Sequence, residues 1–159
     1  MFDINDPADL AALKTEITTD PNTYGYDPTS TYTGILDIIN EKRGTITVSK
    51  PFISPIDIKK ETTYDAYNNL AIDEQEWLRW MTADVSGQEN LAVTSDLRDR
   101  LTGVTGGSAT GDSIWAVADR ATFEPAMLSL IDVDGSRAEE LFGYGTTISR
   151  NDWIAARDS

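Results

Sequence analysis

A glycine-rich stretch, "GVTGGSATGDS" at residues 103–113, is the first place where the residue types suggest ligand chemistry. Loops that bind phosphate through backbone N–H groups follow a strand and carry a Lys directly after the last glycine, because the ammonium group contacts the phosphates. This stretch has no Lys, and no buried strand is predicted before it. We therefore interpret it as a connection between helices rather than a nucleotide site.

A second stretch, "LIDVDGSRAEEL", resembles a calcium-binding loop. If Gly135 takes the place of the turn glycine, Asp132 and Asp134 occupy the third and fifth ligand positions. The first and twelfth positions, which need oxygen ligands, are then Leu130 and Leu141. The pattern therefore predicts a turn and no calcium site.

The titratable residues exclude several kinds of catalysis. The chain has no Cys and no His, so thiol nucleophiles, a Ser-His-Asp triad and Cys/His zinc sites are ruled out. Clustered carboxylates such as Asp73, Glu74 and Glu76 match the preference for negative charge in the first turn of a helix. We therefore expect no enzyme activity, no metal and no cofactor, although a metal-dependent enzyme built on carboxylates remains a third alternative.

The charge balance restricts the partners. The formal net charge is −14 and the pI is about 4.2. Residues 1–80 and 81–159 each carry a net charge of −7. Such a chain is repelled by phosphate backbones and anionic lipids, so we expect neither sequence-specific nucleic-acid binding nor membrane binding. With no apolar run of about 18 residues and no signal peptide at its start, the chain is expected to be made in the cytoplasm.

Aromatic residues are the remaining candidates for a function. Trp77 and Trp80 are three residues apart in a predicted helix, and three tyrosines fall in a predicted loop at 21–32. Trp and Tyr pack in cores, but they are also enriched at protein interfaces. We expect interfaces at this loop, at an extended arm over 45–53 and at the C-terminal helices. The candidate interface residues are Tyr24, Tyr26, Tyr32, Val48, Phe52, Trp77, Trp80 and Trp153.

The pattern of apolar residues and helix caps predicts a mostly α fold, a compact bundle of about eight short helices. Asp6 and Pro7 suit the start of the first helix, and further helices are predicted at 31–43, 55–70 and 73–82. Ser95 is the predicted cap of a short helix before the glycine-rich loop. One small β arm or hairpin is predicted at 45–53, with Pro51 confining it to an edge.

A helix is also predicted over 113–123, with Ile114, Val117, Ala118 and Ala121 facing inward. Pro125 is expected to interrupt the chain after it. We expect a single domain over 1–159, with a candidate sub-boundary in the loop 102–112.

The C-terminal stretch "SRAEELFGYGTTISRNDWIAAR" predicts two capped helices. Ser136 with Glu139 forms a capping-box pattern, and Ser149 caps the second helix. The spacing is similar to that of a DNA-binding helix-turn-helix, but residues 136–159 carry a net charge of −1. Because phosphate contacts normally supply much of the affinity for DNA, we interpret these helices as closing a helical bundle.

The same stretch resembles a C-terminal signature, roughly SRAEELxGxGTxVTxxDVxxAR, of small acidic proteins encoded by tailed bacteriophages. The N-terminal "LKTEITTDPNTYGYD" is similar to that family's opening helix and "DPLGRGY" turn, although "PNTYGY" departs from the commoner loop. The two segments cover about a quarter of the chain. The resemblance implies a component of the phage particle and supplies no catalytic residues.

We therefore expect a virion structural protein, made in the bacterial cytoplasm and present as a homo-oligomeric ring at the head-to-tail connector, or neck. Its expected partners are other copies of itself and virion proteins such as portal, capsid or tail proteins. Capsid decoration and a tail or baseplate role are alternatives within the same class. A phage-encoded regulator, or an acidic mimic that binds a host protein, is the alternative from another class.

Overall fold

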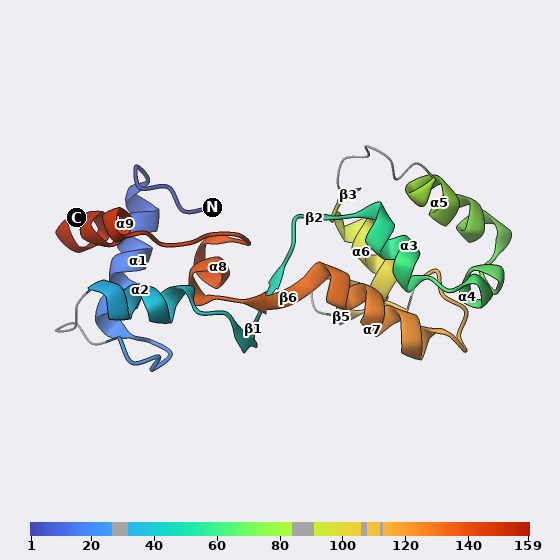
Figure 1. The fold of residues 1–159 in the computed structure, drawn as a ribbon, viewed down its shortest axis with the longest axis horizontal. Coiled ribbons are helices and arrows are strands. Elements are labelled where there is room, and N and C mark those ends of the chain that lie inside the picture. The colour runs from blue at the N-terminus through green and yellow to red at the C-terminus, as the bar shows by residue number, and fades with distance from the viewer. Residues whose placement is uncertain (27–31, 84–90, 106–107, 112) are drawn as a thin grey trace. The chain divides into compact units, whose positions relative to one another are not determined.

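The computed structural model describes residues 1–26, 32–83, 91–105, 108–111 and 113–159 of the chain (Figure 1). Parts of two predicted loops, at 27–31, 106–107 and 112, lie outside the described residues. The described part is mostly helical with a few short strands, which confirms the predicted fold class.

The chain divides into two compact units. Unit 1 consists of Met1–Val48 and Asp134–Ser159, and unit 2 consists of Ser49–Val133. The loop 102–112, where the sequence placed a candidate boundary, lies inside unit 2. The division instead follows two strands, β1 (Arg43–Ser49) and β6 (Asp132–Gly135), through which the chain leaves unit 1 and returns to it. The single domain over 1–159 stays a prediction.

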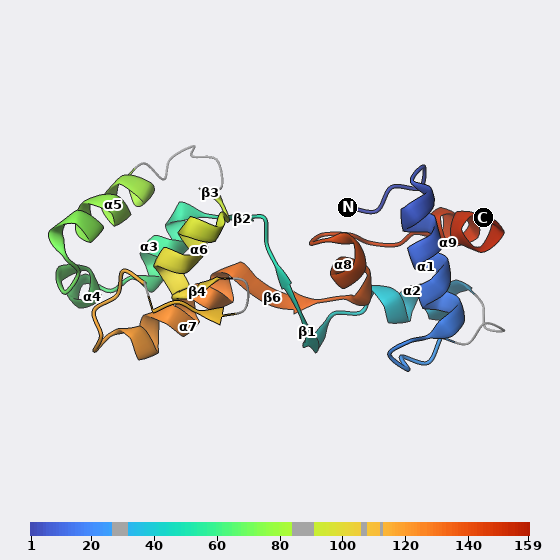
Figure 2. The same cartoon turned by 180° about the vertical axis from the view of Figure 1, so that it is seen from behind.

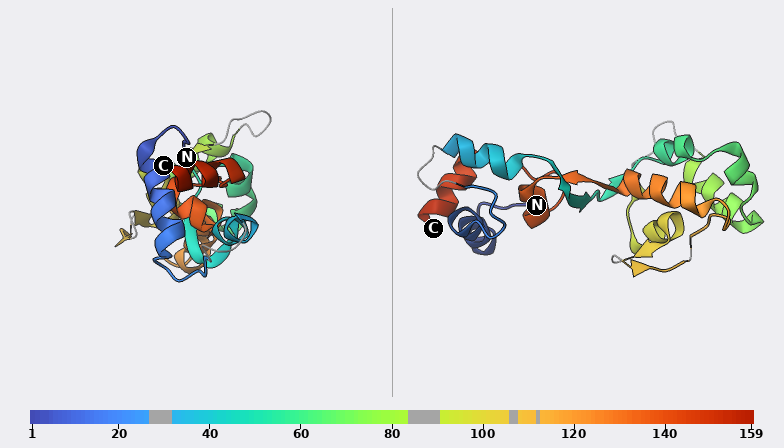
Figure 3. Two further views of the ribbon diagram at one scale, coloured as in Figure 1. Left: turned by 90° about the vertical axis from the view of Figure 1, so that its left-hand side faces the viewer. Right: turned by 90° about the horizontal axis from the view of Figure 1, so that it is seen from below.

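Unit 1 is built from both ends of the chain. Helix α9 (Arg150–Asp158) lies against α1 (Pro7–Thr19), as the red and blue helices show in Figures 1 and 3. Helix α2 (Tyr32–Asn40) contacts α8 (Arg137–Phe142) and α9, and strands β1 and β6 pair. The core consists of side chains from these helices and the segments beside them, including Leu13, Ile17, Ile35, Ile39, Ala138, Phe142 and Ile148.

Unit 2 has its own core. It contains helices α3 (Pro55–Glu61), α4 (Tyr64–Asn68), α5 (Ile72–Thr82), α6 (Ser95–Thr102) and α7 (Arg120–Ile131). Helices α6 and α7 lie side by side (Figure 2), and α3 contacts both α5 and α7. Strands β4 (Val104–Thr105) and β5 (Ser108–Ala109) form an antiparallel pair. The core side chains include Ile58, Leu78, Leu97, Leu101, Trp115, Phe123, Met127 and Ile131.

The predicted helix starts are confirmed where the signal is a local side-chain cap. The Asp6 carboxylate accepts the N–H two residues on, at 2.8 Å. Ser136 and Glu139 form a reciprocal capping box, with N···O distances of 3.2 and 2.9 Å. Ser149 and Asp152 form another, at 3.3 and 2.8 Å. Each cap satisfies N–H groups that have no partner inside the helix.

The segment 45–53 is extended, as predicted, but its two strands do not pair with each other. β1 pairs with β6, and β2 (Phe52–Ile53) pairs antiparallel with β3 (Leu91–Ala92). Pro51 separates β1 from β2, and its carbonyl accepts the Val93 N–H at 2.8 Å. A proline cannot donate to a ladder, so the chain changes partner at this point.

The first part of the helix predicted over 113–123 is wrong. Residues 113–119 are not helical and end in a turn at 117–119, and α7 begins only at Arg120. The helix continues through Pro125, where the sequence predicts an interruption. Trp115 turns inward, where its indole N–H donates to the Leu101 carbonyl at 2.7 Å and its ring stacks on Phe123 at 5.0 Å. Ile114 is buried as predicted, whereas the predicted inward residues Val117, Ala118 and Ala121 are exposed.

Other helix limits also differ from the prediction. α2 ends at Asn40, whose side-chain amide exchanges two 2.9 Å hydrogen bonds with the backbone of Ile148. The helix predicted over 55–70 is two helices, because Thr63 caps α4 through the Ala66 N–H. The cap of α6 is Thr94, one residue before Ser95. None of the helices in the described ranges is long and apolar enough to span a membrane.

Candidate interaction surfaces

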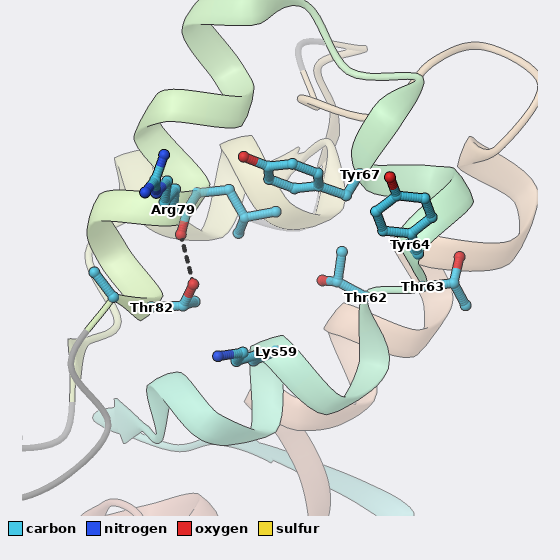
Figure 4. A pocket seen from close by; sticks show the side chains of 9 residues that line it. Lys59, Thr62, Thr63, Tyr64, Tyr67, Arg79 and Thr82 are labelled. Carbon is cyan, nitrogen blue, oxygen red and sulfur yellow. Dashed lines mark hydrogen bonds between the residues drawn. The ribbon is translucent and has the colours of Figure 1, made fainter.

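A groove in unit 2 lies between α3, α4 and α5 and has a volume of about 590 Å³. Lys59 comes from α3, Tyr64 and Tyr67 from α4, and Arg79 from α5, and their side chains surround the open centre of the groove in Figure 4. The full lining is Lys59, Thr62, Thr63, Tyr64, Tyr67, Leu78, Arg79, Thr82 and Ala83. Its size is in the range of cavities that hold a small ligand or one large side chain.

Hydrogen bonds fix the corner between α4 and α5 that forms one wall. The Tyr67 hydroxyl donates to the Gln75 carbonyl at 3.3 Å, and the Gln75 side chain donates to the Leu70 carbonyl at 3.0 Å. On the α5 wall, the Thr82 hydroxyl donates to the Leu78 carbonyl at 2.8 Å, which is the dashed line in Figure 4. The groove is therefore set by the fold of unit 2 and needs no partner to form.

The groove concentrates positive charge on an acidic body. Unit 2 has 14 Asp and Glu against 7 Lys and Arg, so most cations have a carboxylate within reach. Lys60 lies 3.6 Å from Asp57 in this way. Within the described ranges, however, neither Lys59 nor Arg79 makes an ion pair. Neither residue is predicted from the sequence, because an isolated Lys and Arg twenty positions apart give no signal until the helices bring them together.

A row of exposed residues runs along the outer side of α5. Ile72, Glu76 and Trp80 are spaced four residues apart, so they lie on one face of the helix. Ile72 is 77% exposed and Trp80 is 73% exposed. Asp73 is also exposed next to them. We call Ile72, Asp73, Glu76 and Trp80 the outward stripe of α5.

The other predicted interface residue on this helix has a different environment. Trp77 packs against the core of unit 2, and the Arg100 guanidinium lies 4.6 Å from the centre of its ring. Arg100 also lies 3.6 Å from Glu74. A cation over an indole ring is a stabilising contact. The two tryptophans of α5 thus differ in environment. Trp77 contacts α6, whereas the ring of Trp80 is exposed to solvent.

In unit 1 the structure brings together Tyr32 and Trp153, whose ring centres are 6.2 Å apart. Arg150 lies over the Tyr32 ring at 4.7 Å, and Arg157 lies over the Trp153 ring at 4.9 Å. Trp153 packs partly on the core of unit 1. These four side chains form a second surface in which rings and guanidinium groups alternate.

The other two tyrosines of the predicted loop point toward the protein. Tyr26 is buried, and its hydroxyl donates to Glu16 at 3.3 Å. Burial, with the Glu16 carboxylate adding to it, raises the pKa of the Tyr26 phenol. Tyr24 packs edge-on against Tyr26 and lies 4.6 Å below the guanidinium of Arg43. Both rings therefore make contacts within unit 1 of the same chain. An interface role for them stays a prediction.

The two candidates from the extended arm also differ. Val48 is buried in unit 1 and packs closely on Gly135, whereas Phe52 in unit 2 is 52% exposed. The two residues lie in different strands, β1 and β2, and these strands have different partners.

A buried ion pair that the sequence analysis did not identify joins the two ends of unit 1. Glu16 on α1 is only 3% exposed and accepts two hydrogen bonds from Arg137 on α8, at 2.9 and 2.7 Å. The hydrogen bonds to Glu16 raise the pKa of Arg137 despite its partial burial. Arg137 also binds Glu140 at 2.7 Å. Since the partners are 121 positions apart, no local spacing could have revealed the pair.

A comparable ion pair lies in unit 2, between Arg98 and Asp132. Both guanidinium N–H groups of Arg98 donate to the carboxylate of Asp132, and the Ser49 hydroxyl donates to the same carboxylate at 2.6 Å. Burial alone would raise the pKa of Asp132, but the hydrogen bonds from Arg98 and Ser49 outweigh it and lower that pKa. The pair ties α6 to the end of α7, close to the point where the chain leaves unit 2.

Within the described residues, no three Asp or Glu side chains lie close enough together to hold a metal ion. Comparison with known protein families, curated proteins and solved structures finds no match to this chain.

Proposed function

We propose that this chain is a structural component of a tailed-phage particle, which assembles into a homo-oligomeric ring at the head-to-tail connector. The observation that carries the proposal is the groove and stripe of unit 2, where large exposed apolar side chains lie beside two cations that form no ion pair in the described ranges. Exposed Trp, Tyr and Arg side chains are the residue types that dominate binding at protein interfaces.

The resemblance to acidic phage proteins supports the same class. Both segments that carry it, at 13–27 and 136–157, lie in unit 1. Glu16 of the first segment binds Arg137 of the second, and Ser136 and Ser149 cap the two C-terminal helices. The residues that carry the resemblance therefore stabilise the fold of unit 1, which agrees with a non-catalytic role.

The even negative charge also supports a place in the particle. Units 1 and 2 each carry a net charge of −7. An acidic lining repels the phosphate backbone, so duplex DNA passes such a protein without sticking to it. Low affinity for duplex DNA suits a connector, because the genome enters and leaves the head through it.

Quantitative mass spectrometry of purified particles tests the proposal. A connector ring should be present in the particle at a copy number close to that of the portal protein, and it should remain after washing with high salt. A copy number close to that of the major capsid protein would instead indicate capsid decoration. Absence from the particle would contradict a structural role and favour the regulator or the acidic mimic.

A further inference from the structure

We propose that the groove between α3, α4 and α5 is a receptor for the outward stripe of α5 from a second copy of this chain. This inference rests on the proposed function in one respect, since it supplies the contact between neighbours that a homo-oligomeric ring needs.

The charges of the two surfaces are complementary. The groove presents Lys59 and Arg79 without ion-pair partners in the described ranges. The stripe presents Asp73 and Glu76, both exposed and likewise without an ion pair in those ranges. Placing the stripe in a neighbour's groove brings two carboxylates to two cations. On a chain with net charge −14, such a contact also lessens the repulsion between copies.

The apolar parts match as well. The stripe carries Ile72 and Trp80, which leave most of their surface in water. The groove has an apolar floor at Leu78 and two aromatic walls, at Tyr64 and Tyr67. If the Trp80 ring of one copy enters the groove of another, water is displaced from both the ring and the groove. The ring then lies beside Lys59 and Arg79, and such cations bind the faces of aromatic rings. Large aromatic anchors that fill a partner's pocket are typical interface hot spots.

The two surfaces adjoin each other on α5. Leu78 and Thr82 line the groove, whereas Ile72, Glu76 and Trp80 lie on the neighbouring side of the helix, next to Arg79. Ile72 and Trp80 are mostly exposed, so neither fills the groove of its own copy. A contact between two different patches is heterologous, and repeating it generates a ring where the rotation closes.

Sedimentation velocity of the full chain over a range of concentrations tests the proposal. The wild-type chain should self-associate at an ionic strength that screens the repulsion between copies of net charge −14. Lys59→Glu should weaken it at least roughly tenfold, because a carboxylate then faces Asp73 or Glu76. The matched control is Lys60→Glu, which makes the same charge change on the same helix but replaces a residue paired with Asp57 outside the groove. This control should associate like the wild type.

Trp80→Ala removes the anchor of the stripe and should weaken self-association roughly thirtyfold. Because Trp80 is mostly exposed, its loss should leave the fold intact, and a far-UV circular dichroism spectrum with a urea unfolding curve checks this for every variant.

Mixing the two defective variants gives the sharpest result. Lys59→Glu retains an intact stripe, and Trp80→Ala retains an intact groove. An equimolar mixture should therefore form one-to-one dimers and stop at that size, although each variant alone is monomeric at the same concentration. Symmetric contacts between identical patches would not show this complementation.

Three outcomes would overturn the proposal: a wild-type chain that stays monomeric at every concentration, Lys59→Glu associating as strongly as Lys60→Glu, or a mixture that fails to complement. In the first case the groove would be left to a different acidic protein. These results are independent of the proposed function, because a chain found in particles at the copy number of the portal could still be monomeric in solution.

Discussion

Gly135 and Val48 approach so closely that one added methyl group should destabilise unit 1. A Cβ atom on Gly135 would lie 2.6 and 2.7 Å from the two Cγ atoms of Val48 and 3.2 Å from its Cβ. Carbon atoms at van der Waals contact are about 3.5–4.0 Å apart. Gly135→Ala therefore forces either the Val48 side chain or one of the strands β1 and β6 to move.

The expected cost comes from two opposing effects. Overpacking a close contact typically costs about 1–3 kcal/mol. Replacing glycine with alanine lowers the entropy of the unfolded chain, which returns about 0.4–1 kcal/mol. We therefore expect Gly135→Ala to lower the free energy of unfolding by about 1–2 kcal/mol.

A double-mutant cycle measured by urea unfolding isolates the clash. Val48→Ala alone removes two buried methyl groups and should cost about 1.6 kcal/mol. In the double variant the atoms that the clash involves most are gone, because only the Val48 Cβ position at 3.2 Å remains. The double variant should therefore be at least about 1 kcal/mol more stable than the sum of the two single effects.

Gly44→Ala is the matched control on the same strand pair. A Cβ atom there would meet nothing closer than the Asp134 carboxylate oxygens at 3.9 Å, which is ordinary contact. This variant should be as stable as the wild type or slightly more so. If Gly135→Ala were equally harmless, or if the two single effects simply added, the close approach of β1 and β6 would not limit stability and the reasoning would be refuted.

Three further predictions concern the buried polar groups. Arg137→Ala leaves the Glu16 carboxylate buried without its partner, and it should lower the free energy of unfolding by about 3–5 kcal/mol in urea titrations, more than the double change with Glu16→Leu. Trp115→Phe leaves a buried backbone carbonyl of α6 unpaired and should cost about 1–3 kcal/mol in the same assay, with loss of Trp near-UV circular dichroism. For Asp132, whose folded pKa is lowered, the stabilisation relative to Asp132→Asn should be complete above the unfolded pKa of about 3.9. It should decrease as the pH falls through the folded pKa; a difference that stays constant from pH 7 to acid would contradict this.

The parts of the fold that sequence reasoning predicted are those decided within one helical turn. Ser136 with Glu139, Ser149 with Asp152, and Asp6 form caps through atoms two or three positions apart, so the spacing alone indicates them. What it could not predict depends on distant partners. Nothing near 45–53 indicates that its strands pair with residues 132–135 and 91–92.

The error around Trp115 has the same origin. The apolar spacing of Ile114 and Val117 is typical of a helix, but the Leu101 carbonyl and the Phe123 ring hold Trp115 inward, and the local backbone follows that contact. For the candidate surfaces, the sequence does not distinguish Trp77 from Trp80, and only the fold shows that Trp77 packs on the core while Trp80 is exposed. The cations of the groove carried no signal in the sequence.

The division of unit 1 between the two ends of the chain has a consequence for synthesis on the ribosome. Helices α1 and α2 leave the ribosome early, but α8 and α9, against which they pack, follow only after the 85 residues of unit 2. At translation rates of about 5–20 residues per second, this delay is on the order of ten seconds. During that time Leu13, Ile35 and Ile39 have no complete core to enter. Unit 2 is contiguous and can fold first, so nascent unit 1 is where we expect chaperones to bind.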